Sequence, residues 1–79
     1  MNLESLKKGD VIFITNISGD RHKADFMEFT DDGVYVNFQG FGHLEMKWKD
    51  IASIDQVMQE HKKGNSYGPR YKVFLWKSP

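Results

Sequence analysis

Residues 43–49 alternate between polar and apolar side chains, and this alternation constrains the fold more than any other feature of the sequence. Leu44, Met46 and Trp48 fall on one side of an extended chain, and the residues between them are charged or are histidine. A period of two is typical of a β-strand that has one face in a core and the other face in water. We therefore expect Leu44, Met46 and Trp48 to be buried together.

Similar patterns along the rest of the chain predict a series of short strands. They are expected over residues 10–16, 22–30, 34–39, 42–48, 53–59 and 71–76, with helical turns near residues 3–6 and 49–52 and a polar loop over 60–69. In the first strand, four consecutive apolar residues predict cover on both faces. In the last strand, Tyr71, Val73 and Leu75 alternate with Lys72, Phe74 and Trp76.

Turn residues between these segments support the assignment. Asp31-Asp32-Gly33 predicts a hairpin, because Asp-Gly readily supplies a positive φ angle. Strands of this length and spacing predict a meander that curls, since closure of a sheet removes its exposed edges. We expect an all-β fold: a small, strongly curved antiparallel sheet or barrel of five to six strands with a short N-terminal helical turn, in one domain over residues 1–79.

Three stretches of the sequence resemble the SH3-like and Sm-like small β-barrels. They are residues 6–11 at the entry, residues 29–34 at a central hairpin and residues 48–54, where a tight turn leads into the next strand. This resemblance implies an SH3-like barrel. Ala24 stands where the Sm pattern has Gly, and Lys49-Asp50 stands where it has a late Arg-Gly or Lys-His pair. The resemblance therefore implies a fold rather than a binding site.

Composition limits the function classes. The chain of 79 residues has no cysteine, which removes disulfides and thiolate zinc sites. The N-terminus lacks the apolar run of a signal peptide, and no segment approaches the roughly 18 apolar residues of a membrane span. We expect a cytoplasmic protein with no membrane partner.

The sequence carries no pattern typical of catalysis. No Gly-x-Ser-x-Gly or Gly-x-x-x-x-Gly-Lys motif is present, and Asp31-Asp32 is better explained by a turn. His22, His43 and His61 lie too far apart for a metal-binding spacing. His43 is expected either to be solvated or to make a pH-sensitive contact. We expect no enzyme activity, no metal and no cofactor.

The first binding hypothesis is a protein–protein interaction or self-association to a homo-oligomer. Tyr35, Phe41, Tyr67 and Trp76 are candidate anchors, because aromatic residues are enriched where interfaces are tightest. Phe41 stands between two glycines and cannot easily fold back into a core, although it could instead cap one end of a barrel. The small size of the chain also suggests an accessory or inhibitor protein of a phage.

The alternative hypothesis is binding of single-stranded nucleic acid or an anionic nucleotide by residues 61–77. Residues 61–79 carry a net charge of +5 and residues 1–60 carry −5. The candidate residues are Lys62, Lys63, Tyr67, Arg70, Lys72 and Trp76, since cations hold phosphates and aromatic rings stack on bases. The same residues could instead form a solvated loop and a core strand, with the oppositely charged ends attracting each other.

Overall fold

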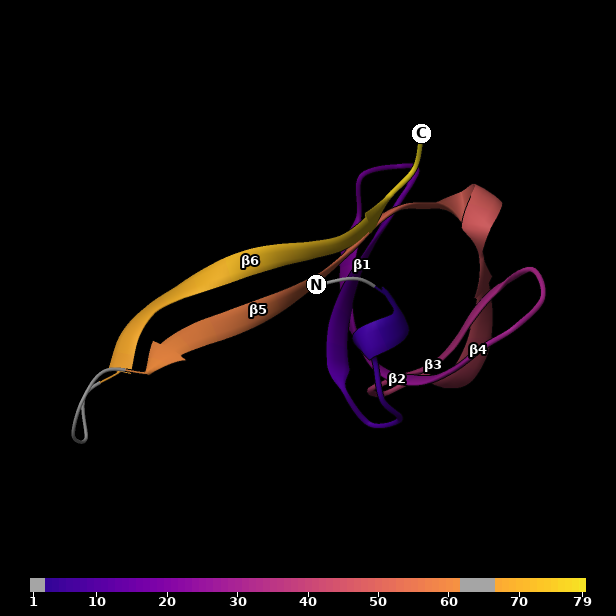
Figure 1. Cartoon of the computed structure of the whole chain (residues 1–79). Coiled ribbons are helices and arrows are strands. Elements are labelled where there is room, and N and C mark those ends of the chain that lie inside the picture. The colour runs from indigo at the N-terminus through magenta and orange to yellow at the C-terminus, as the bar shows by residue number, and fades with distance from the viewer. Residues whose placement is uncertain (1–2, 62–66) are drawn as a thin grey trace.

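The computed structural model describes residues 3–61 and 67–79, and in these ranges the chain is all-β (Figure 1). Six antiparallel strands form one sheet: β1 (Val11–Asn16), β2 (Arg21–Phe29), β3 (Gly33–Phe38), β4 (Gly42–Lys47), β5 (Ile51–His61) and β6 (Tyr67–Lys77). Two 3₁₀ turns complete it, η1 (Leu3–Ser5) at the N-terminus and η2 (Trp48–Asp50) between β4 and β5. The predicted fold class, a strongly curved antiparallel sheet with an N-terminal helical turn, is confirmed.

The sheet has the strand order β4-β3-β2-β1-β5-β6 and is open. β4 and β6 lie at its two edges, so the curl is completed by the chain passing through η2 rather than by a further ladder (Figure 1). β5 and β6 continue beyond the curl as a long hairpin (Figure 1). Of the two alternatives predicted, the curved open sheet is the one observed.

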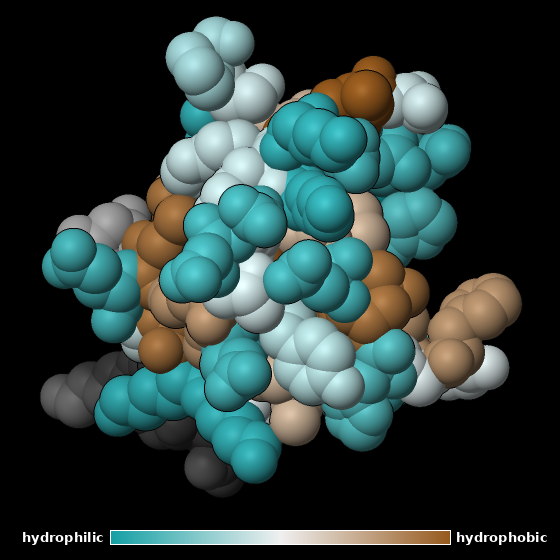
Figure 2. All heavy atoms as spheres, turned by 90° about the vertical axis from the view of Figure 1, so that its right-hand side faces the viewer, coloured by the Kyte–Doolittle hydropathy of each residue, from teal (hydrophilic) through white to brown (hydrophobic). Residues whose placement is uncertain are grey.

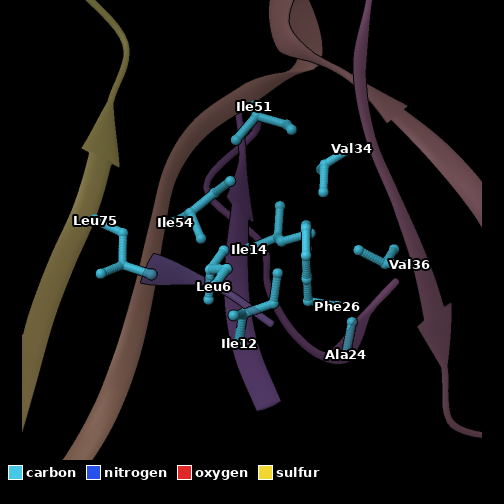
Figure 3. Close-up of a cluster of buried hydrophobic side chains, with 10 residues drawn as sticks. All are labelled: Leu6, Ile12, Ile14, Ala24, Phe26, Val34, Val36, Ile51, Ile54 and Leu75. Atoms are coloured by element: carbon cyan, nitrogen blue, oxygen red, sulfur yellow. The ribbon is translucent and has the colours of Figure 1, made fainter. Parts of the chain in front are cut away.

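A core of hydrophobic side chains, all but one of them aliphatic, fills the inside of the curl (Figure 3). Alternate residues of β1, β2 and β3 supply most of it, as a period of two requires, whereas a register shift in β5 places Ile51 and Ile54 in the core although they are three residues apart. Leu6, which follows η1, is also buried there, and Leu3 packs against the core. The buried members are Leu6, Ile12, Ile14, Ala24, Phe26, Val34, Val36, Ile51, Ile54 and Leu75.

Two expectations about burial are wrong. β1 is covered on one face only, because Ile12 and Ile14 are fully buried whereas Val11 is exposed on the other face. In β4, Met46 packs against the core but Leu44 remains 40% exposed. The physical reason is that β4 is an edge strand, and the described part of the chain leaves the end of it that carries Leu44 uncovered.

Trp48 behaves as the alternation predicts and packs against the core. Its ring lies 5.0 Å from the ring of Trp76 and 6.3 Å from that of Phe29, measured between centroids. Because these rings come from η2, β6 and β2, they connect the two ends of the sheet. The fluorescence of Trp48 and Trp76 is therefore a suitable signal for unfolding.

The polar loop expected over residues 60–69 is shorter than predicted. β5 continues to His61 and β6 begins at Tyr67, and these two residues are paired. Cross-strand hydrogen bonds satisfy the backbone of such a hairpin without a core, so an apolar alternation is not needed there. The prediction from apolar periodicity could not detect strands of this kind.

Gly33 is required for a reason different from the one expected. The hairpin between β2 and β3 is present, but Gly33 is not among the glycines with positive φ. It is buried and pairs with Lys47 of β4. A Cβ atom at this position would overlap the carbonyl oxygen of Met46 and would lie 2.8 Å from Cα of Lys47. Glycine is therefore needed for the close approach of β4.

Candidate functional site

A hollow of about 280 Å³ opens where β1 ends, β2 begins and β3 turns into β4. We name it the apolar groove, because most of its lining side chains are hydrophobic. The lining residues are Asn16, His22, Phe38, Phe41, Leu44 and Met46. Figure 2 shows one face of the molecule, on which separate hydrophobic patches interrupt a largely hydrophilic surface.

The polar members of the apolar groove have structural contacts of their own. His22 packs edge-on against Phe38, with ring centroids 5.9 Å apart. The Oδ1 atom of Asn16 accepts hydrogen bonds from the backbone N–H groups of Ser18 and Asp20, both at 3.0 Å. These contacts hold one wall of the groove in place, so the groove exists before a ligand arrives.

Phe41 is the most exposed large hydrophobic side chain in the described residues, at 90%. Gly40 and Gly42 on either side both have φ of +92°, a backbone angle that residues with a side chain rarely adopt. The N–H of Phe41 donates to the carbonyl of Phe38 at 3.0 Å, so the turn fixes the backbone while the ring projects. The expectation that Phe41 does not fold back is confirmed, and the ring does not cap the core.

The edge of β4 borders the apolar groove. β4 is hydrogen-bonded to β3, and no described strand pairs with its other side. In an antiparallel ladder, every second residue directs its backbone N–H and C=O away from the partner strand. β4 therefore presents backbone donors and acceptors along its open side. Its outward side chains, His43, Glu45 and Lys47, are exposed.

Tyr35 lies on the opposite face of β3 from Val34 and Val36, away from the apolar groove. Its ring stacks on that of His43, with centroids 5.6 Å apart and an interplanar angle of 13°. Tyr35 is therefore half-covered by a neighbour on its own sheet. The structure does not bring Tyr35 and Phe41, two of the predicted anchors, into one surface.

Trp76 does not lie with the other predicted site residues of β6. A bulge at Leu75 shifts the register between Ile54 and Asp55, so Trp76 faces the core while Phe74 faces outward. A bulge adds one residue to one strand and reverses the alternation beyond it. The expectation that Phe74 and Trp76 share a face is wrong for this reason.

The remaining predicted residues are in β6 or outside the described ranges. Arg70 and Lys72 are exposed and lie on β6. The backbone of Tyr67 begins β6, but its side chain is not described. Lys62 and Lys63 lie outside the described residues. The groove residues His22, Phe38 and Leu44 were not predicted, because they come from three strands and show no common sequence signal.

In the ranges that the structure covers, no three His, Asp or Glu side chains gather closely enough to hold a metal ion. The helical segments described there are three-residue turns, and none could cross a membrane. No protein-family model, curated protein or solved structure matches the chain.

Proposed function

We propose that this chain is a non-catalytic binding module that takes an extended segment of a partner protein along β4. One large apolar side chain of that segment fills the apolar groove, and Phe41 packs beside it. The observation that carries this proposal is the position of the groove: Leu44 and Met46, two alternate residues of an open edge strand, form part of its lining.

The size of the groove supports a side chain rather than a cofactor. Small-molecule sites usually enclose about 300–1,000 Å³. At about 280 Å³, the apolar groove is near the lower end of that range, a size that suits a single large anchoring residue. Aromatic residues at the centre of an interface commonly dominate its binding energy, and Phe41 is placed to do so.

The open side of β4 supports an extended partner. A peptide that adds to a sheet edge gains main-chain hydrogen bonds, and its alternate side chains enter pockets on one face. Opposite charges directly across a ladder are favourable. Glu45 and Lys47 therefore favour a segment with a basic residue facing Glu45 and an acidic residue facing Lys47.

We expect that peptides selected from a random display library against the purified protein have apolar residues at alternate positions. Replacing Phe41 with alanine should weaken the binding of such a peptide about tenfold or more, as the loss of an aromatic hot-spot residue commonly does. Titration of the labelled peptide by fluorescence anisotropy measures this effect. Tyr71→Ala is the matched control, because Tyr71 is an exposed aromatic on β6, away from the groove.

Mapping the bound peptide by amide chemical shifts separates the possible results. Shifts concentrated on β4 and the turn at Phe41 support the proposal. Shifts on another surface, or equal affinity for the Phe41→Ala protein and the parent, contradict it. A dimer in sedimentation that dissociates on Phe41→Ala would identify a second copy as the occupant instead of a foreign segment.

A further inference from the structure

The outer face of the sheet carries a second surface, formed by strands from both ends of the chain. Phe13 of β1 and Phe74 of β6 are both paired with Asp55 of β5, so the two rings flank one position. We name the cations around them, together with the two rings, the basic face. Its members are Phe13, Arg21, Lys23, Arg70, Lys72, Phe74 and Lys77.

Strand register places these residues in adjacent rows. One row across β2, β1, β5 and β6 is Lys23, Phe13, Asp55 and Phe74, and the next is Arg21, Thr15, Ser53 and Lys77. Neighbouring strands lie about 4.8 Å apart, so each row spans roughly 14 Å. The bulge at Leu75 is what brings Lys77 onto the same face as Phe74.

Arg21 is held over the ring of Phe13. Its guanidinium carbon lies 3.9 Å from the ring centroid. Its Nη2 atom donates to Oδ2 of the buried Asp55 at 2.6 Å, and its Nε atom donates to Oδ1 at 3.4 Å. A guanidinium fixed in this way presents a planar group on which a base can stack.

Phe74 is exposed and has two flexible cations beside it. The Nζ atom of Lys77 lies 4.0 Å from the ring centroid, and that of Lys72 lies 5.6 Å away. A cation–π contact at an exposed site is weaker than the stacking of a base on an aromatic ring. A base can therefore displace either ammonium group from the ring, and the displaced lysine remains close enough to meet a phosphate.

A shallow hollow beside Phe13 adds a place for a base. It encloses about 360 Å³, with Lys23 of β2 on one side and Arg70 of β6 on the other. Val11 and Val57, both exposed, contribute its apolar lining. Cations from two distant parts of the chain thus flank an apolar floor.

The basic face carries more cations than carboxylates although the net charge of the chain is zero. Among the described residues, its five cations are accompanied on the same face of β1, β2, β5 and β6 by three carboxylates, Asp25, Glu28 and Asp55, and Asp55 is paired with Arg21. We propose that the basic face binds single-stranded nucleic acid, with phosphates on the lysines and Arg70 and bases stacked on Phe74 and on the Arg21–Phe13 pair. The carboxylates of an acidic peptide would contact the cations, but the exposed ring of Phe74 would have no stacking partner and the hollow would stay empty.

Binding of a fluorescein-labelled oligo(dT) of about 15 nucleotides, within the usual site sizes of such surfaces, tests the proposal. Anisotropy should show dissociation constants below about 100 µM at low salt, weakening steeply as salt rises. The double change Lys72→Gln and Lys77→Gln should weaken binding about tenfold and reduce the salt slope by about 1.4, because each phosphate that a lysine neutralises adds about 0.7 to the slope. Lys8→Gln with Lys49→Gln is the control, since both lysines are exposed outside the basic face and the change in charge is the same.

The contribution of the bases is tested separately. Phe74→Leu keeps an apolar side chain but removes the stacking ring, and it should weaken the binding of oligo(dT) about fivefold or more. It should leave the binding of an abasic oligonucleotide of the same length unaffected. Tyr71→Leu, at an exposed aromatic residue on the opposite face of β6, should weaken the binding of neither probe. Circular dichroism spectra of the variants are the control that each one retains its strands.

Results of three kinds would overturn the proposal. One is no salt-sensitive binding of oligo(dT) at protein concentrations of about 100 µM. Another is an equal drop in affinity in the Lys8/Lys49 control. The third is equal affinity for the abasic probe or equally effective competition by polyglutamate, which would show a surface for polyanions or acidic peptides in place of nucleic acid.

Discussion

Replacing Gly33 with alanine is expected to lower the free energy of unfolding by about 3 kcal/mol, at the upper end of the usual cost of overpacking. The added Cβ atom would overlap the carbonyl oxygen of Met46, which belongs to the backbone and cannot move aside as a flexible side chain could. Relief requires β4 to move away from β3 at the pairs Gly33–Lys47 and Val34–Met46. Urea titration followed by tryptophan fluorescence measures this destabilisation.

Gly19→Ala is the matched control for this experiment. Gly19 has φ of +92° but no atom within 4 Å of an added Cβ, so the substitution strains the backbone without a clash. Its cost should be about 1 kcal/mol. If Gly19→Ala destabilises the protein as much as Gly33→Ala does, the close approach of β4 is not the reason for glycine at position 33.

The strands could be predicted because the alternation of polar and apolar side chains depends only on residues that are neighbours in the sequence. The clash at Gly33 could not, because it depends on Met46, a residue of the following strand. The same limit applies to Leu44, whose alternation indicates burial although the described residues leave it 40% exposed at its end of the edge strand β4. Periodicity reports which side chains share a face, and tertiary packing decides whether that face is covered.

The candidate surfaces were predictable only in part. Phe41 could be identified because two glycines flank it, and its exposure follows from that short sequence. The basic face could not be identified from residues 61–77 alone, since Phe13, Arg21 and Lys23 join it through pairing across the sheet. The face on which Trp76 lies could not be predicted, because a bulge leaves no recognisable mark in an apolar alternation.

The second large effect is expected at the ion pair between Arg21 and Asp55. Asp55 is 1% exposed, whereas the side chain of Arg21 is 36% exposed. Arg21→Met keeps much of the apolar stem but leaves a buried carboxylate without its partner. The free energy of unfolding should fall by roughly 2–4 kcal/mol, somewhat less than for a fully buried pair because water reaches the Arg21 side. Urea titration of the variant checks this value.

A double variant separates the cost of an unpaired buried carboxylate from the packing of the two side chains. Arg21→Met combined with Asp55→Leu replaces both charges with apolar groups of similar size, and such replacements are often neutral or stabilising. The double variant should therefore be at least about 1 kcal/mol more stable than Arg21→Met alone. Arg70→Met, at an exposed position of β6, is the control and should change stability by less than about 0.5 kcal/mol. If the double variant is less stable than Arg21→Met, Asp55 contributes to stability through contacts other than its ion pair with Arg21.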